Sequence, residues 1–197
     1  MTSKEKNIST NVADRVSGGW WSSGWRSHQE NIQIVIVAML LALLIRAFVA
    51  EPRYIPSDSM VPTLHISDRL VVEKLSYRFR QPATGDIIVF SPPKQLQVQG
   101  FTKDQAFIKR AIGQPGQTVA VHNGRVYLNS KPLQEDYIAE PPEYELEPQR
   151  VPENQYFVMG DNRNDSNDSS KWGFLPKTNI IGRAVFRFWP LDRAGLL

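Results

Sequence analysis

Apolar residues are concentrated in one long run near the N-terminal end of the chain. Residues 31–50 read N-I-Q-I-V-I-V-A-M-L-L-A-L-L-I-R-A-F-V-A, and no polar residue interrupts the stretch from 34 to 45. A helix needs about 20 mainly apolar residues to cross the hydrocarbon core of a bilayer. The run is apolar all round, unlike the one-sided helix of a soluble domain. The pattern therefore predicts a single transmembrane anchor over residues 31–50.

The residues before this run are polar. Residues 1–30 show no helical or strand period and are expected to form a flexible leader. A cleavable signal peptide would place its apolar run nearer the N-terminus and follow it with a small-x-small site. The long polar leader therefore favours a retained anchor. Arg26 precedes the run and Arg53 follows it, so the positive-inside rule does not fix the orientation.

From residue 51 onward the pattern changes to short β-prone runs separated by turns. Strands are predicted at 70–72, 87–90, 107–112, 118–121, 125–128, 156–159 and 181–189. Asn123-Gly124 lies between two of these runs and supplies the positive φ of a tight hairpin. Residues 134–153 are acidic and proline-rich, and are expected to form an exposed excursion. Residues 51–197 are thus predicted to be one mainly β catalytic domain.

Composition removes several classes of function. The chain has no cysteine, which excludes a cysteine nucleophile, a zinc–thiolate site and disulfides. His28, His65 and His122 show no metal-ligand spacing, so no metal or cofactor is expected. The net charge is only +3, without a long basic run, so nucleic acid is not an expected partner. The 14 prolines and 12 glycines suit a β-rich domain with many turns.

The segment just after the apolar run carries the first candidate chemistry. It reads I-P-S-D-S-M-V-P-T-L over residues 55–64, with Ser57 and Ser59 between Pro56 and Pro62. Proline fixes its own φ and restricts the residue before it, so the backbone around the serines is stiff. Such a backbone suits a nucleophile held at a fixed angle, although ordinary loops share this composition.

A lysine lies within the apolar segment F-I-K-R-A-I-G, residues 107–113. On a strand, Phe107, Lys109 and Ala111 share one face because side chains alternate. The ordinary lysine pKa of about 10.4 makes a poor base near neutrality, and burial lowers that pKa. A neutral Lys109 amine is able to take the proton of a serine hydroxyl. The alternative is a lysine on the exposed face of an amphipathic strand.

Polar residues crowd the loop that follows the predicted strand at 156–159. This loop, M-G-D-N-R-N-D-S-N-D-S-S-K-W-G, spans residues 159–173. Its carboxylates are of the type that bind calcium, but their spacing differs from that of an EF-hand. The loop is also suited to hydrogen bonds that fix a nearby catalytic amine.

Together these segments resemble the conserved boxes of type I signal peptidases (leader peptidases), bacterial-type serine peptidases with a Ser/Lys dyad. P-S-D-S-M-V-P-T-L resembles the nucleophile box, and T-G-D-I-I-V-F, residues 84–90, resembles the structural strand box. F-I-K-R-A-I-G-Q-P-G resembles the general-base box, and G-D-N-R-N-D-S-N-D-S resembles the last box. The boxes occur in register after a single anchor, which is far more specific than any one motif.

The resemblance implies a role for each matched residue. Ser59 would be the nucleophile and Lys109 the general base, with Ser57 and the Ser59 backbone N–H as the oxyanion hole. Ser166 would orient the Lys109 amine. Pockets for small side chains at the first and third residues before the cut would be formed by Ile55, Pro56, Met60, Leu64 and Ile108. Asp161 and Asp168 would be structural, although Ser170 and Lys171 follow D-S, where the family often has arginine, which puts an ion pair with Asp168 in doubt.

The same resemblance implies a fold, an activity and a location. The fold would be antiparallel, curved β-sheets after the anchor. The activity would be that of a membrane-bound serine endopeptidase, which removes signal peptides from exported preproteins by cutting after small residues. Its partners would be these preproteins and the lipid bilayer. The domain would lie on the extracytoplasmic side of a cell membrane or of an internal thylakoid-type membrane. The oligomeric state is not predicted.

Two other interpretations compete with this one. Ser91-Pro92-Pro93-Lys94 matches the S-x-x-K motif of penicillin-recognising enzymes, but that motif needs a helix, which the prolines oppose, and no S-D-N or K-T-G follows. A non-enzymatic, membrane-tethered β domain that binds a partner would share the anchor and the strands. It would not require Ser59, Lys109 and the polar loop together. A serine-reactive acylating reagent should label Ser59 of a peptidase with a catalytic dyad, and should not label a binding domain.

Overall fold

The N-terminal part of the described chain is one long helix. A computed structural model describes residues 21–197, with side chains from residue 31 onward. Helix α1 spans Trp21–Phe48, and its segment Asn31–Phe48 has a mean hydropathy of 2.2 and is long enough to cross a membrane. The helix ends two residues before the predicted end of the anchor, because Ala50 begins a strand. It also begins inside the segment expected to be a flexible leader, the first part of which lies outside the described residues.

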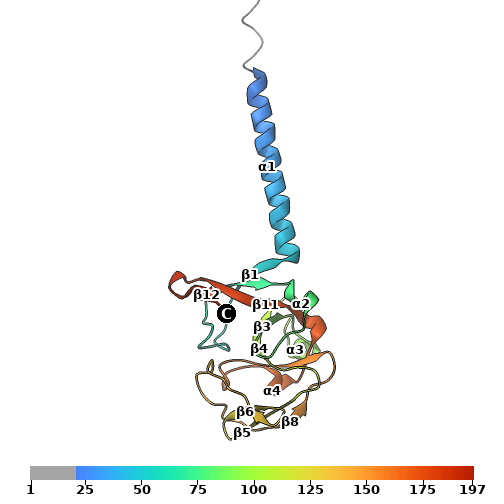
Figure 1. The fold of residues 1–197 in the computed structure, drawn as a ribbon, viewed down its shortest axis with the longest axis vertical. Helices are drawn as coiled ribbons and strands as arrows, with labels where there is room; N and C mark the ends of the chain where they lie inside the picture. Colours follow the sequence, from blue (N-terminus) through green and yellow to red (C-terminus); the bar gives the residue numbers. More distant parts are fainter. Residues whose placement is uncertain (1–20) are drawn as a thin grey trace, which may run out of the picture. The chain divides into compact units, whose positions relative to one another are not determined.

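Residues 45–197 form a compact unit dominated by antiparallel strands (Figure 1). The larger sheet has the order β1-β2-β11-β3-β4-β9-β10, and β12 pairs with β11. Its strands are β1 (Ala50–Tyr54), β2 (Arg69–Glu73), β3 (Ile87–Phe90), β4 (Phe107–Gly113), β9 (Gln155–Met159), β10 (Leu175–Pro176), β11 (Ile180–Trp189) and β12 (Gly195–Leu196). This arrangement places β4 in the interior of the sheet, between β3 and β9.

A smaller sheet has the order β7-β6-β5-β8, and Figure 1 shows β5, β6 and β8 grouped together. Its strands are β5 (Thr118–His122), β6 (Arg125–Leu128), β7 (Lys131–Pro132) and β8 (Leu146–Arg150). Short helices lie between strands: α2 (Ser76–Phe79), α3 (Lys94–Val98), α4 (Ser169–Trp172), η1 (Lys177–Asn179) and η2 (Leu191–Arg193). The β5–β6 turn has Asn123 at φ 51° and Gly124 at φ 71°, as the predicted hairpin requires.

The predicted fold class, mainly β with curved antiparallel sheets, is confirmed. Each of the seven predicted strands is present in the structure, within two residues at either end. The pairing of β11 with β2 and β3 shifts register at three places, between Ile180 and Gly182, Ala184 and Phe186, and Arg187 and Trp189. Such irregularities increase local twist and bend a strand, which explains the curvature of the larger sheet.

The segment 134–153, expected to be an exposed excursion, is exposed over much of its length but is tied to the domain at several points. Residues Leu146–Arg150 form strand β8, which pairs with β5, and Val151 is buried. The side chain of Glu135 is only 5% exposed because it pairs with Arg163. Much of residues 134–153 is exposed, as expected, but the composition gives no sign of the β8 pairing or of the Glu135–Arg163 ion pair.

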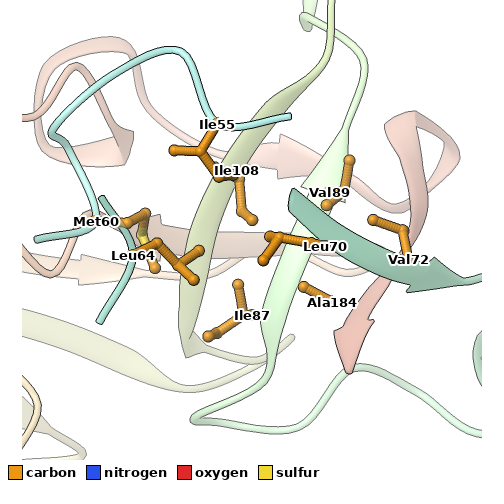
Figure 2. Packing of buried hydrophobic residues seen from close by; sticks show 9 residues of the cluster. All are labelled: Ile55, Met60, Leu64, Leu70, Val72, Ile87, Val89, Ile108 and Ala184. Atoms are coloured by element: carbon orange, nitrogen blue, oxygen red, sulfur yellow. The ribbon is translucent and has the colours of Figure 1, made fainter. Parts of the chain in front are cut away.

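Apolar side chains from the loop after β1 anchor that loop on the larger sheet. One core cluster consists of Ile55, Met60, Leu64, Leu70, Val72, Ile87, Val89, Ile108 and Ala184 (Figure 2). Met60 and Leu64 are fully buried in it, and each buried side chain of this size contributes roughly 1.5–3 kcal/mol to stability. This packing fixes the loop that carries Ser57 and Ser59.

Candidate active site

The loop that carries Ser59 is held at both ends by backbone hydrogen bonds. Ile55 N donates to Asp68 O at 3.0 Å, and Ser67 N donates to Ile55 O at 3.0 Å. Within the loop, Leu64 N donates to Met60 O at 2.8 Å, which closes a turn. Ser59 itself is 8% exposed. The nucleophile candidate therefore lies on a rigid turn rather than on a free loop.

Lys109 reaches Ser59 from the interior of the larger sheet. Its Nζ donates a hydrogen bond to Ser59 Oγ at 2.7 Å and another to Ile108 O at 3.0 Å. Strand β4 is flanked by β3 and β9, where Ile88 pairs with Lys109 in register. Lys109 is only 4% exposed, so the exposed-face alternative does not describe this strand.

Burial lowers the pKa of Lys109 to about 8, from an ordinary value of 10.5. Removal from water disfavours the ammonium form, while the carboxylates of Asp168 and Asp161 act in the opposite direction. Removal from water has the larger effect on the pKa of Lys109. A substantial fraction of the Lys109 amine is therefore neutral at mildly alkaline pH, which is the state that a general base requires.

Ser57 lies beside the pair. Its Oγ is 3.3 Å from Ser59 Oγ, and both side chains line the same cleft. A hydroxyl donor next to the reacting oxygen is suited to an oxyanion that develops during attack on a carbonyl.

The loop after β9 approaches Ser59 from the other side. Asn162 N donates to Ser59 O at 3.2 Å. A Cβ built on Gly160 would overlap both Ser59 O and Ser166 Oγ, so only glycine permits this close approach. Ser166 is 3% exposed, but none of the hydrogen bonds among residues 31–197 joins its Oγ to Lys109. The structure thus places Ser166 Oγ and Ser59 O against the same glycine, without showing the expected contact of Ser166 with the amine.

The two buried aspartates of this loop have different partners. Asp161 accepts bonds from Arg110 Nε at 2.8 Å and Nη2 at 2.6 Å, and from Thr63 Oγ1 at 2.6 Å. Asp168 Oδ2 accepts from Gly160 N at 2.9 Å. Asp168 Oδ1 accepts from the Ser170 hydroxyl at 2.7 Å and its N–H at 3.1 Å. Ser170 therefore satisfies Asp168 with neutral donors instead of an ion pair.

A cleft of about 670 Å³ opens over Ser59 and Lys109. Of the five expected pocket residues, Ile55, Pro56 and Ile108 line it. Met60 and Leu64 do not, because the turn directs them into the core beneath (Figure 2). Sequence reasoning missed several wall residues: Tyr54, Phe101, Gln105, Ala106, Phe107, Asp165 and Asn167. The segment 101–106 has no motif of its own, so only its position next to β4 reveals it.

No group of three or more histidine, aspartate or glutamate side chains suited to hold a metal occurs within the described part of the chain.

The chain is a serine-type peptidase, a hydrolase, as its family and its relatives show. The family model described as signal peptidase, peptidase S26, matches residues 28–189, and the chain belongs to this family. As a member of it, the chain removes signal peptides from preproteins.

The relatives come from bacteria and from plant chloroplasts. A probable signal peptidase I-1 of Synechocystis is 65% identical over 175 residues, which is 89% of each chain. A signal peptidase I of Leptolyngbya laminosa is 55% identical and covers 85% of this chain and 83% of its own. A probable thylakoidal processing peptidase 2 of Arabidopsis thaliana is 43% identical over 94% of this chain and 52% of its own.

Among solved structures, a signal peptidase I from Enterococcus faecalis is 32% identical and superposes with a TM-score of 0.44. The match covers 53% of this chain and 97% of the other.

Proposed function

We propose that this chain is a membrane-bound serine endopeptidase that cuts signal peptides with a Ser59/Lys109 dyad, after residues with small side chains. The observation that carries the proposal is the 2.7 Å contact between Lys109 Nζ and Ser59 Oγ, in a cleft beside a second serine. Few arrangements place a buried, desolvated amine against a serine hydroxyl. A structural lysine would be expected to pair with a carboxylate or to reach water.

In the proposed reaction, the neutral Lys109 amine takes the proton of Ser59 as Oγ attacks the scissile carbonyl. The ammonium then gives this proton to the departing amine of the mature protein, which leaves an ester between Ser59 and the signal peptide. Water hydrolyses this ester with Lys109 again as base, and the Ser59 proton is restored. No group other than the substrate and water is consumed.

The oxyanion of each tetrahedral intermediate would be held by the Ser57 hydroxyl and the Ser59 backbone N–H. Ser57 stands next to the reacting oxygen, and Pro56 restricts the backbone before it. One donor of this kind contributes about 3 kcal/mol to transition-state stabilisation. We assign Asp161 and Asp168 to the support of this geometry, because they pin the Gly160 loop against Ser59.

Selection of small side chains is assigned to the apolar wall of the cleft. Ile55 and Ile108 are 2% and 7% exposed, so they limit the depth of any pocket without filling the cleft. Met60 and Leu64 would act only from beneath, by fixing the floor. We assign to Ser166 the orientation of the Lys109 amine, because its buried Oγ has no other partner among residues 31–197.

Membrane attachment is assigned to the segment Asn31–Phe48 of α1. Each described side chain in it is solvent-facing in the structure, and the segment is apolar. A signal peptide keeps its apolar core in the bilayer, so a tethered peptidase meets the cleavage site close to the membrane surface. We propose that residues 51–197 work on the extracytoplasmic side of a cell membrane or a thylakoid-type membrane, because the relatives include a bacterial signal peptidase and a thylakoidal processing peptidase.

Cleavage of a preprotein by the full chain in detergent micelles tests the proposal. Ser59→Ala and Lys109→Met should abolish processing and remain folded, and Ser57→Ala should lower kcat by about 100-fold with little change in KM. Ser91→Ala is the matched control, because its hydroxyl bonds Asn179 O away from the cleft. Processing by folded Ser59→Ala would refute the dyad.

A further inference from the structure

The segment Leu133–Ile138, which follows β7, carries two side chains that contact the arginines of the catalytic region. We call residues 133–138 the support segment. Leu133 N donates to Val126 O at 2.8 Å, so this segment is fixed to the smaller sheet. Glu135 forms two hydrogen bonds with Arg163, Nη1 to Oε2 at 2.8 Å and Nη2 to Oε1 at 2.6 Å. The Tyr137 hydroxyl also donates to Glu135 at 2.8 Å.

The Glu135–Arg163 pair is removed from water. The Arg163 side chain is 0% exposed and that of Glu135 is 5% exposed. A buried guanidinium without its carboxylate is strongly unfavourable, so Arg163 keeps its place only while Glu135 does. Arg163 Nε in turn donates to Gly160 O at 2.9 Å. Gly160 is the residue whose missing side chain lets the loop touch Ser59 O and Ser166 Oγ.

A second path from the support segment runs through Tyr137. The Arg110 guanidinium lies over the Tyr137 ring at 4.0 Å from its centre, a cation–π geometry. The same guanidinium makes two hydrogen bonds to Asp161, which accepts a third from Thr63 in the nucleophile loop. Tyr137 thereby covers the face of an ion pair that joins the Gly160 loop to the residues just after Ser59.

We propose that Glu135 and Tyr137 are positioning residues of the peptidase reaction, which hold Arg163 and Arg110 and thereby set the Gly160 loop against Ser59. Neither residue touches the cleft, so their action passes through the two arginines. This inference rests on the proposed Ser59/Lys109 function and adds to it a support that comes from a different sheet.

The test measures kcat and KM of the full chain on a preprotein for Glu135→Gln, with Glu140→Gln as the matched control. Glu140 is exposed and makes no ion pair among residues 31–197. Displacement of a catalytic group by about 1 Å costs up to about 100-fold in rate, so we expect kcat of Glu135→Gln to fall by about tenfold or more with KM within about twofold. Glu140→Gln should match the wild type.

A double-mutant cycle separates positioning from a general loss of stability. If Glu135 acts through Arg163, then Glu135→Gln should change kcat by less than about twofold in an Arg163→Met background, measured per folded enzyme. A residue that only stabilises the fold would lower the folded fraction and leave kcat per folded enzyme unchanged. That result, or wild-type kcat in folded Glu135→Gln, would overturn the inference.

Two further variants, Tyr137→Phe and Ser59→Ala, complete the test. If Glu135→Gln does not fold, Tyr137→Phe decides, since it removes only the hydroxyl bond to Glu135: a kcat lowered by about threefold or more supports the inference, and wild-type kcat overturns it. Ser59→Ala is assayed in parallel. Processing by Ser59→Ala refutes the dyad and the inference together, whereas an unaffected Glu135→Gln with an inactive Ser59→Ala refutes the inference alone.

Discussion

Lys109 is 4% exposed and the pKa of its amine is lowered to about 8, and these two properties are linked. Burial removes water from the ammonium, and the Asp161 and Asp168 carboxylates compensate only in part. The sequence motif identified Lys109 as the candidate base. The residues next to Lys109 in the sequence could not show whether its side chain lies in the core or at the surface. Lys109 is buried because β4, the strand that carries it, lies between β3 and β9 in the sheet.

The pH dependence of cleavage follows from this pKa. The proposed mechanism requires a neutral Lys109, so kcat/KM should increase about tenfold per pH unit at acidic pH and level off above about pH 8. The measurement is preprotein cleavage under subsaturating conditions from about pH 5.5 to 10. A profile that is flat, or that falls as pH increases through 8, would contradict the assignment of Lys109 as base.

Replacement of Lys109 should have opposite effects on activity and on stability: the activity is lost, whereas the free energy of unfolding increases. The folded-state pKa lies below the unfolded value of 10.5, so the penalty of burying the ammonium is fully present below about pH 8 and disappears above 10.5. Lys109→Met should therefore stabilise the fold near pH 7 by roughly 1–3 kcal/mol, although it is inactive.

Denaturant unfolding of both proteins near pH 7 and near pH 9.5 measures this difference, which should narrow at the higher pH. A Lys109→Met protein that is less stable than the wild type near pH 7 would show that the Lys109–Ser59 contact outweighs the burial of the charge.

Other residue assignments depended on contacts that the sequence cannot show. Glu135 and Arg163 are 28 residues apart and come from segments of different character. Met60 and Leu64 lie in the matched motif, yet the turn that contains them points both into the core. Motif matching identifies residues that occur together, whereas the direction of each side chain depends on backbone geometry.

At the scale of secondary structure, the strands rich in β-branched residues were predictable and the edge strands were not. Segments such as I-I-V-F in β3 have a clear apolar signal. The missed strands β1, A-E-P-R-Y, and β8, L-E-P-Q-R, contain proline and charge. Both lie at the edge of their sheets, where proline is tolerated because one side of the strand needs no partner.

The Gly160 loop offers a test of how closely two elements must approach. Gly160→Ala should lower kcat by about 100-fold, because the added methyl group must push away either the Ser59 carbonyl or the Ser166 side chain. It should also destabilise the fold by roughly 1–3 kcal/mol. The measurements are preprotein cleavage and thermal unfolding.

Gly195→Ala is the matched control, because a Cβ at Gly195 meets no atom within 4 Å. This variant should keep both the activity and the stability of the wild type. Equal activity of the Gly160→Ala and Gly195→Ala proteins would mean that the loop does not set the position of Ser59.

At the scale of the whole molecule, the proposed function gives the apolar helix and the β domain separate tasks, membrane attachment and catalysis. The run of apolar residues was readable from sequence because its length and composition suffice, without knowledge of tertiary contacts. The predicted end of the anchor at residue 50 was less exact, since the helix ends at Phe48 and β1 begins at Ala50. The curvature of the larger sheet depends on irregular pairing of β11, for which the sequence carries no local signal.

Membrane attachment should depend on the middle of this helix. An acidic residue at the centre of a transmembrane helix opposes insertion by about 2.5–3.5 kcal/mol, so Leu40→Asp should reduce the membrane-bound fraction of the full chain. Val98→Asp is the control, since Val98 is 88% exposed and lies outside α1, at the end of the short helix α3. Flotation with lipid vesicles measures the bound fraction, and equal binding of both variants would refute the anchor.

The most direct test of the dyad is the site and rate of acylation by a serine-directed reagent, read by mass spectrometry of the digested full chain. We predict a single adduct on the peptide that contains Ser59, formed faster as pH increases toward about 8 and lost in Lys109→Met. An adduct on another serine, or one that forms on Ser59 at the same rate without Lys109, would contradict the assignment of Ser59 and Lys109 as a catalytic pair.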